Sequence, residues 1–93
     1  AGIGLKYQVY IEASARRFMR KLPRAVQKRL DPAIMALADT PRPAGCVLLA
    51  GHPNTYRIRV GDFRVLYRIY DDRLVVLIIR IGHRGDIYRR LMD

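Results

Sequence analysis

The sequence has little of what usually builds metal sites, disulfides or membrane spans. Its single cysteine, Cys46, excludes an intramolecular disulfide and a thiolate metal cluster, and it fits a reducing compartment, so we expect a cytoplasmic protein. The two histidines, His52 and His83, lie far apart in the chain and do not indicate a zinc site. We therefore expect no metal and no other cofactor. No apolar run approaches the ~20 residues that a membrane span needs, so we expect no membrane association.

Acidic residues are also scarce, and this leaves a large positive charge. Eight Asp and Glu stand against 18 Lys and Arg, which gives a formal net charge of +10. A balance of this size indicates a nucleic acid, an anionic membrane or an acidic protein as partner. About half of the 93 residues are apolar, so the chain is expected to fold as one domain, 1–93, around one core. Residues 1–6 are expected to form a flexible N-terminus.

The first half of the chain predicts a strand followed by two helices. Residues 7–12 read as a short strand, and Ser14 is a plausible N-cap for a helix that ends at residue 22. A second helical stripe runs over 23–39, so the two helices are expected to form a hairpin. Pro32 interrupts this stripe. Either the helix kinks there or Asp31 caps a separate segment.

The second half predicts a loop and then a sheet. Residues 40–55 carry three of the five prolines and read mostly as loop. Strands are expected over 56–60, 63–70 and 74–81, joined by tight turns, and a short helical or irregular segment follows from residue 84. The fold class is α+β: an N-terminal strand, a helical hairpin, an antiparallel meander and a short C-terminal helical segment.

Between Tyr56 and Arg90 the chain interleaves strand residues with nine arginines and no lysine. Alternation along a strand places Arg57 and Arg59 on one face, and it does the same for Arg64 and Arg68. Guanidinium groups pair bidentately with phosphate oxygens, so this face is predicted to bind RNA or another polyanion. Apolar residues on a charged face often mark a partner site. We expect three of them to lie there and to contact a protein partner: Leu66, Val76 and Ile78.

Several blocks of the sequence together resemble the RelE/ParE toxin superfamily, and the RelE branch fits better. The blocks are Leu49-Ala50-Gly51, YRIRVGDFRVLY (56–67), Gly82-His83-Arg84 and Ile87-Tyr88-Arg89, with Leu22-Pro23 and Thr40-Pro41 in matching places. The resemblance implies the toxin of a type II toxin–antitoxin system, neutralised by an acidic antitoxin as partner. It also implies an mRNA interferase, that is, an endoribonuclease that cleaves mRNA in the ribosomal A site by attack of the 2′-hydroxyl, with contacts to 16S rRNA.

The resemblance also implies the residues of the site. It carries catalytic positions onto Arg59, Arg64, His83, Arg84 and Tyr88. RNA contacts are expected from Arg57, Arg68 and Arg80. Arginine stays protonated and is a poor base, whereas histidine ordinarily titrates near neutrality. His83 is therefore the expected acid or base, with Tyr88 as the other candidate. Related RelE sequences carry lysines where this chain has Arg57 and Arg59, so the identity of the base stays open.

Two other functions fit the same residues. ParE-like members of the superfamily share the scaffold and act on DNA gyrase, so a gyrase inhibitor without nuclease activity is the first alternative. The second is a non-catalytic RNA-binding module, whose arginines only contact phosphates. A purely structural interpretation is that the arginines only keep an exposed sheet face solvated.

Overall fold

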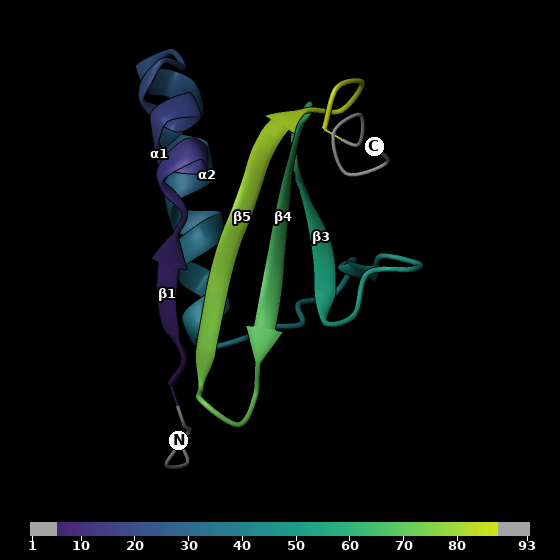
Figure 1. Cartoon of the computed structure of the whole chain (residues 1–93). Coiled ribbons are helices and arrows are strands. Elements are labelled where there is room, and N and C mark those ends of the chain that lie inside the picture. Colours follow the sequence, from purple (N-terminus) through teal and green to yellow (C-terminus); the bar gives the residue numbers. More distant parts are fainter. Residues whose placement is uncertain (1–5, 88–93) are drawn as a thin grey trace.

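The computed structural model describes residues 6–87, in which one strand and the helices precede a run of four strands (Figure 1). The N-terminal half contains β1 (Gln8–Ile11), α1 (Ala13–Arg20), α2 (Arg24–Met35) and the 3-10 turn η1 (Ala36–Ala38). The C-terminal half contains β2 (Val47–Leu48), β3 (Thr55–Val60), β4 (Phe63–Tyr70) and β5 (Val75–His83). The predicted α+β class is confirmed.

The five strands form one mixed sheet in the order β1-β5-β4-β3-β2. Strands β2 to β5 pair with their sheet neighbours in antiparallel fashion, as the predicted meander requires. Strand β1 instead pairs in parallel with β5, so it joins the far side of the meander. A parallel neighbour needs a crossover connection, and the chain between β1 and β5 supplies it with both helices and strands β2 to β4.

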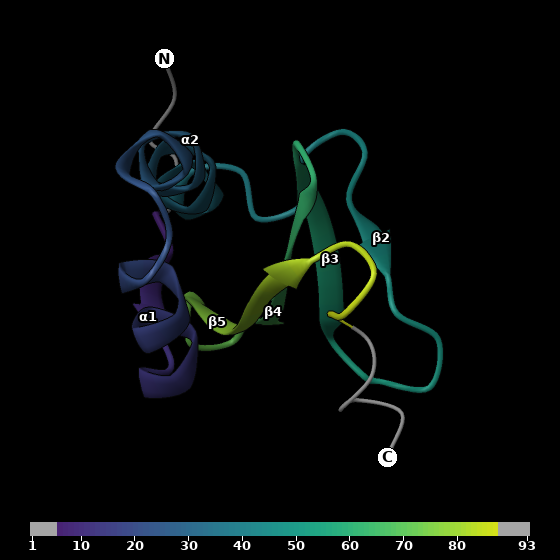
Figure 2. The same cartoon turned by 90° about the horizontal axis from the view of Figure 1, so that it is seen from above.

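Helices α1 and α2 cover one face of the sheet, and the other face carries no helix within residues 6–87 (Figure 2). The covered face holds the core. Leu30 and Ile34 of α2 and Met19 of α1 pack there against Val65 and Tyr67 of β4, all nearly or fully buried. Full burial of one such side chain stabilises the fold by about 1.5–3 kcal/mol. The uncovered face is therefore free to carry charge.

The helix ends differ from the sequence prediction in detail. Ser14 does not cap α1: it lies inside the helix, and Glu12 occupies the cap position without a side-chain hydrogen bond. Helix α2 begins after Pro23 and runs through Pro32 to Met35, so a separate segment capped by Asp31 is excluded. The turn after β5 covers residues 84–87, and the residues expected to continue it as a helix lie outside the described part of the chain.

The face assignment of β5 was wrong for Val76 and Ile78. Both side chains are fully buried in the core on the helix-covered side. The register explains this, because Val76 pairs with Ile69 and Ile78 pairs with Tyr67, two residues of the core face. Neither residue offers a surface to a protein partner, so we withdraw both as antitoxin contacts.

Candidate nucleic-acid interface

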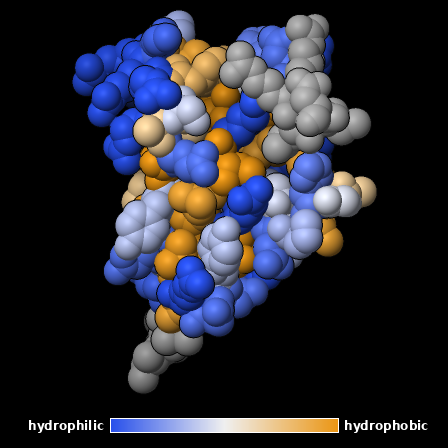
Figure 3. All heavy atoms as spheres, in the orientation of Figure 1, coloured by the Kyte–Doolittle hydropathy of each residue, from blue (hydrophilic) through white to orange (hydrophobic). Residues whose placement is uncertain are grey.

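The uncovered side of the sheet, which we call the arginine face, carries five predicted arginines. Adjacent strands pair Arg59 with Arg64. They also pair Leu66 with both Arg57 and Arg80, and Arg68 with Thr55. Figure 3 looks onto this side and shows hydrophilic side chains set around an apolar strip. The face is therefore suited to a polyanion.

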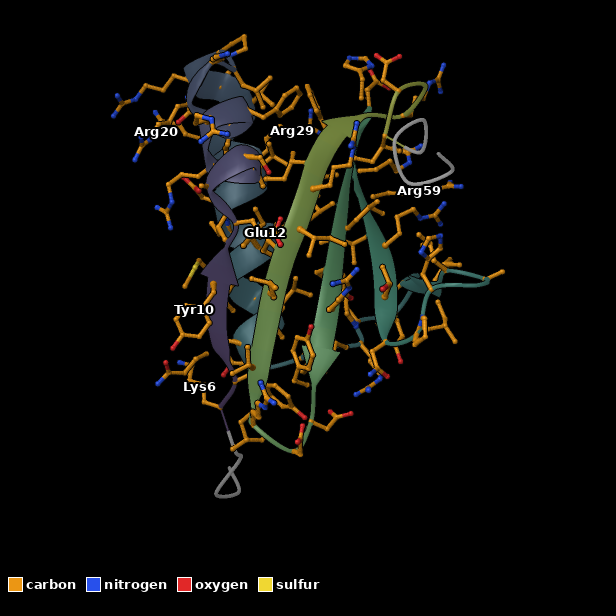
Figure 4. All side chains as sticks on the ribbon, viewed as in Figure 1. Lys6, Tyr10, Glu12, Arg20, Arg29 and Arg59 are labelled. Atoms are coloured by element: carbon orange, nitrogen blue, oxygen red, sulfur yellow. The ribbon has the colours of Figure 1, made fainter. Side chains whose placement is uncertain are left out.

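Arg59 and Arg64 face each other beside the turn that joins β3 to β4. Arg59 is exposed and projects from β3 away from the helices (Figure 4). Arg64 is half-buried, and its Nη1 donates hydrogen bonds of 3.0 Å to the carbonyl oxygens of Gly61 and Phe63. These two bonds orient one side of the guanidinium group. Arg64 is thus held in place, whereas the exposed Arg59 can extend toward a ligand. We call this pair, Arg59 and Arg64, the arginine clamp.

The turn between β3 and β4 also fixes the neighbours of the clamp. The backbone N–H of Arg84 donates to the carbonyl oxygen of Asp62 over 2.9 Å, which ties the segment after β5 to this turn. Gly61 has φ of +61°, a conformation that glycine adopts at no steric cost. A Cβ atom at Gly61 would lie 2.8 Å from Nη2 of Arg29, so this α2 arginine reaches across to the turn. No pattern in the sequence predicts this role for Arg29.

Leu66 and its two arginine neighbours form the middle of the arginine face. Leu66 is fully buried, although it lies outside the main core cluster, and Arg57 and Arg80 flank it in register. Both arginines are half-buried, as expected when their aliphatic stems cover apolar surface. The prediction that Leu66 shares a face with the arginines is confirmed. Its burial leaves it no exposed surface for an antitoxin.

His83 lies at the same end of the sheet but on the other side of β5. It pairs with Phe63, and the two rings meet edge to face with centroids 4.9 Å apart. Strand alternation puts Gly82 on the arginine face and His83 with Phe63 on the side of α1. The structure therefore does not bring His83 together with the arginine clamp.

The remaining predicted residues lie apart from the clamp or beyond the described residues. Arg68 is on the arginine face, four residues along β4 from Arg64, which corresponds to about 13 Å. Tyr88 lies outside the described residues. Among residues 6–87 no group of three His, Cys, Asp or Glu could hold a metal ion.

The opposite end of the sheet is tied by a polar network that the sequence did not reveal. Asp71 accepts hydrogen bonds from Tyr7 at 2.5 Å and from two nitrogens of Arg42 at 2.7 and 3.2 Å. The Nε of Arg42 also donates to the hydroxyl of Tyr56. The bonds from Arg42 and then from Tyr7 lower the pKa of Asp71 to about 2. This network joins β3, the turn between β4 and β5, and the segment before β1.

Known proteins with the same fold and a similar sequence identify the family. Residues 9–88 match the family model described as the ParE toxin of the type II toxin–antitoxin system parDE. The chain is 38% identical to toxin RelG of Mycobacterium tuberculosis over 87 residues, which cover 92% of this chain and 100% of that protein. It is 27% identical to the mRNA interferase toxin RelE of Escherichia coli over 88 residues, covering 90% and 92% of the two chains.

A solved structure agrees with these relatives. One chain in the crystal structure of the toxin–antitoxin complex RelBE2 from Mycobacterium tuberculosis superposes with a TM-score of 0.75 at 32% identity. The match covers 88% of this chain and 95% of that one. The chain belongs to the RelE/ParE family of type II toxins, and the resemblance read from the sequence is confirmed. Within residues 6–87, no helix is long and apolar enough to cross a membrane.

Proposed function

We propose that this protein is the toxin of a type II toxin–antitoxin system and an mRNA interferase that cleaves mRNA in the A site of the ribosome. The observation that carries the proposal is the arginine clamp at one end of an uncovered basic sheet. RelE of Escherichia coli, which is named an mRNA interferase, aligns with 90% of the chain and supports the same reaction. Because the ribosome is the target, the protein works in the cytoplasm.

The proposed reaction is attack of a ribose 2′-hydroxyl on the adjacent phosphate. A bond forms between the 2′-oxygen and phosphorus, and the bond from phosphorus to the 5′-oxygen breaks. Arg59 and Arg64 neutralise the phosphate oxygens as negative charge builds up on them, and Arg84 lies close enough to the same turn to stabilise the leaving oxygen. Because arginines supply the positive charge, we propose that cleavage needs no metal ion.

Proton transfer requires a group other than the two arginines of the clamp, because arginine stays protonated. His83 packs on Phe63 across the strand from the arginine clamp. A well-positioned acid or base contributes about 10²–10⁴ in rate. We propose that cleavage relies mainly on charge stabilisation and on the ribosome, which orients the RNA and supplies much of the entropic advantage. Tyr88 remains a candidate for the proton or for a contact to a base.

We propose an acidic antitoxin as the protein partner. The net charge of +10 supports it, as does the toxin–antitoxin complex among the similar structures. The arginine face and the basic surface of the helical hairpin attract carboxylates. In place of Val76 and Ile78, the hydrophobic contacts come from half-exposed residues of the sheet, Val75 and Leu77.

Primer extension on a defined mRNA, with and without translating ribosomes, tests the proposed function. We expect new 5′ ends within the reading frame only when ribosomes are present. Intact mRNA together with inhibition of gyrase supercoiling by the same preparation would favour a gyrase inhibitor, the alternative that the ParE name of the matched family model keeps open. Intact mRNA and active gyrase would leave a non-catalytic RNA-binding module.

A further inference from the structure

A polar pocket opens at the far end of the arginine face. Its volume is about 270 Å³. The loop before β3 and the end of β4 form its walls. The lining residues are His52, Pro53, Asn54, Thr55, Arg68 and Tyr70. Arginine, tyrosine, histidine and asparagine are the side chains that bind phosphates and unpaired bases in RNA complexes.

The loop wall of this pocket is held by several backbone hydrogen bonds. The N–H of Ile69 in β4 donates to the carbonyl oxygen of Asn54 over 3.1 Å, and Leu49 N–H donates to Thr55 over 2.8 Å. The hydroxyl of Thr55, which is almost fully buried, donates to the carbonyl oxygen of Pro53. The pocket is therefore formed before any ligand arrives, which lowers the entropic cost of binding.

Two side chains give the pocket its chemistry. The Nε of Arg68 donates to Thr55 Oγ1 over 3.4 Å, and a guanidinium group has two further nitrogens that can donate to a phosphate. The ring of Tyr70 lies 5.8 Å from the guanidinium carbon of Arg73, so aromatic and cationic groups meet at the pocket. The neighbouring carboxylate of Asp71 is held by Arg42 and does not compete.

The pocket and the arginine clamp lie on one continuous surface. Tyr70 lies six positions along β4 from Arg64, a distance of about 20 Å. Arg57 and Arg80 lie between them on the same face. At the ~3.4 Å rise of a stacked strand, 20 Å corresponds to about six nucleotides, and an extended strand spans it with fewer.

We propose that this pocket binds one unpaired nucleotide of the RNA strand whose scissile phosphate lies at the arginine clamp. Arg68 contacts the phosphate of that nucleotide, and its base stacks on Tyr70 beside His52. The inference rests on the proposed function for the position of the scissile phosphate. It adds a subsite several nucleotides away, where the identity of a flanking base affects binding.

Fluorescence anisotropy with two labelled oligonucleotides tests the subsite without requiring cleavage. A trinucleotide covers the clamp alone and an octanucleotide reaches the pocket, and 2′-O-methyl groups in both block attack. Wild type should bind the octanucleotide more tightly. Arg68→Gln and Tyr70→Leu should weaken octanucleotide binding by roughly tenfold or more, the effect of losing one stacked or paired nucleotide, and leave trinucleotide binding unchanged. Tyr70→Phe keeps the ring and should bind like wild type.

Three outcomes separate this inference from its alternatives. Unchanged octanucleotide affinity in both Arg68→Gln and Tyr70→Leu would overturn the subsite. Loss of octaglutamate binding in Arg68→Gln with RNA binding intact would also overturn it, and would assign the pocket to carboxylates of an acidic protein. If the wild type fails to cut mRNA on ribosomes but its octanucleotide affinity still depends on Arg68 and Tyr70, the subsite is supported and the endonuclease proposal fails.

Discussion

The turn at Gly61 makes a quantitative prediction that links stability to the arginine clamp. Gly61→Ala forces a residue with a Cβ atom to adopt φ of +61°, which costs roughly 1–2 kcal/mol. The new Cβ would also lie 2.8 Å from Nη2 of Arg29. That nitrogen is at the end of a flexible side chain and can move, so the backbone contribution should dominate. For a domain of this size, we expect the melting temperature to fall by roughly 5–15 °C.

Thermal unfolding followed by circular dichroism measures the effect, and two further variants separate its causes. Gly61→Asn should lose less stability than Gly61→Ala, because asparagine tolerates this conformation better. Adding Arg29→Ala to Gly61→Ala should recover less than about 0.5 kcal/mol, the limit for uncoupled sites. An alanine variant as stable as wild type would refute the backbone argument. Full recovery in the double variant would show that the contact with Arg29 is the cause.

Three further predictions follow from other parts of the structure. The pKa of Asp71, about 2 in the folded protein against ~3.9 unfolded, means that its interactions stabilise the fold above pH ~4 and are lost as the pH falls toward 2. Asp71→Asn should therefore lose less stability than wild type between pH 4 and pH 2 in thermal melts, and an equal loss would contradict the network. Ile78→Ala should lower the free energy of unfolding, measured in urea, by about 2–5 kcal/mol, as for a core residue. A change near zero would indicate that Ile78 is exposed. His83→Ala should reduce ribosome-dependent cleavage by much less than the ~10²–10⁴ of a positioned acid or base, and a loss in that range would place His83 in proton transfer.

Much of the fold could be predicted because the local patterns agree with the tertiary structure. The alternation over 56–60 and 63–70 is regular, and the pairing of Arg59 with Arg64 follows from a two-residue turn at Gly61 and Asp62. Strand β5 gives no such signal. Its run of apolar residues fits either face, and the face is set by the pairing of Tyr70 with Val75 across a four-residue turn.

The site could be predicted only where strand alternation decided it. A register shift between Leu66 and Tyr67 leaves Ile79 without a partner in β4, and no sequence pattern announces such an irregularity. His83 was grouped with the clamp because it adjoins Arg84 in sequence, whereas its side chain lies across the strand. The pocket at Tyr70 was missed because loop residues distant in sequence complete it.

The measurement that tests the central claim most directly is the single-turnover rate of mRNA cleavage on programmed ribosomes for Arg59→Ala. Arg59 is exposed, so its loss should leave the fold intact. Arg20→Ala, which removes an equal charge from the helical hairpin on the far side (Figure 4), is the matched control. We predict that Arg59→Ala slows cleavage by about 10²–10³, the usual effect of removing one group that stabilises transition-state charge, while Arg20→Ala has little effect. Equal rates for the two variants would contradict the arginine clamp.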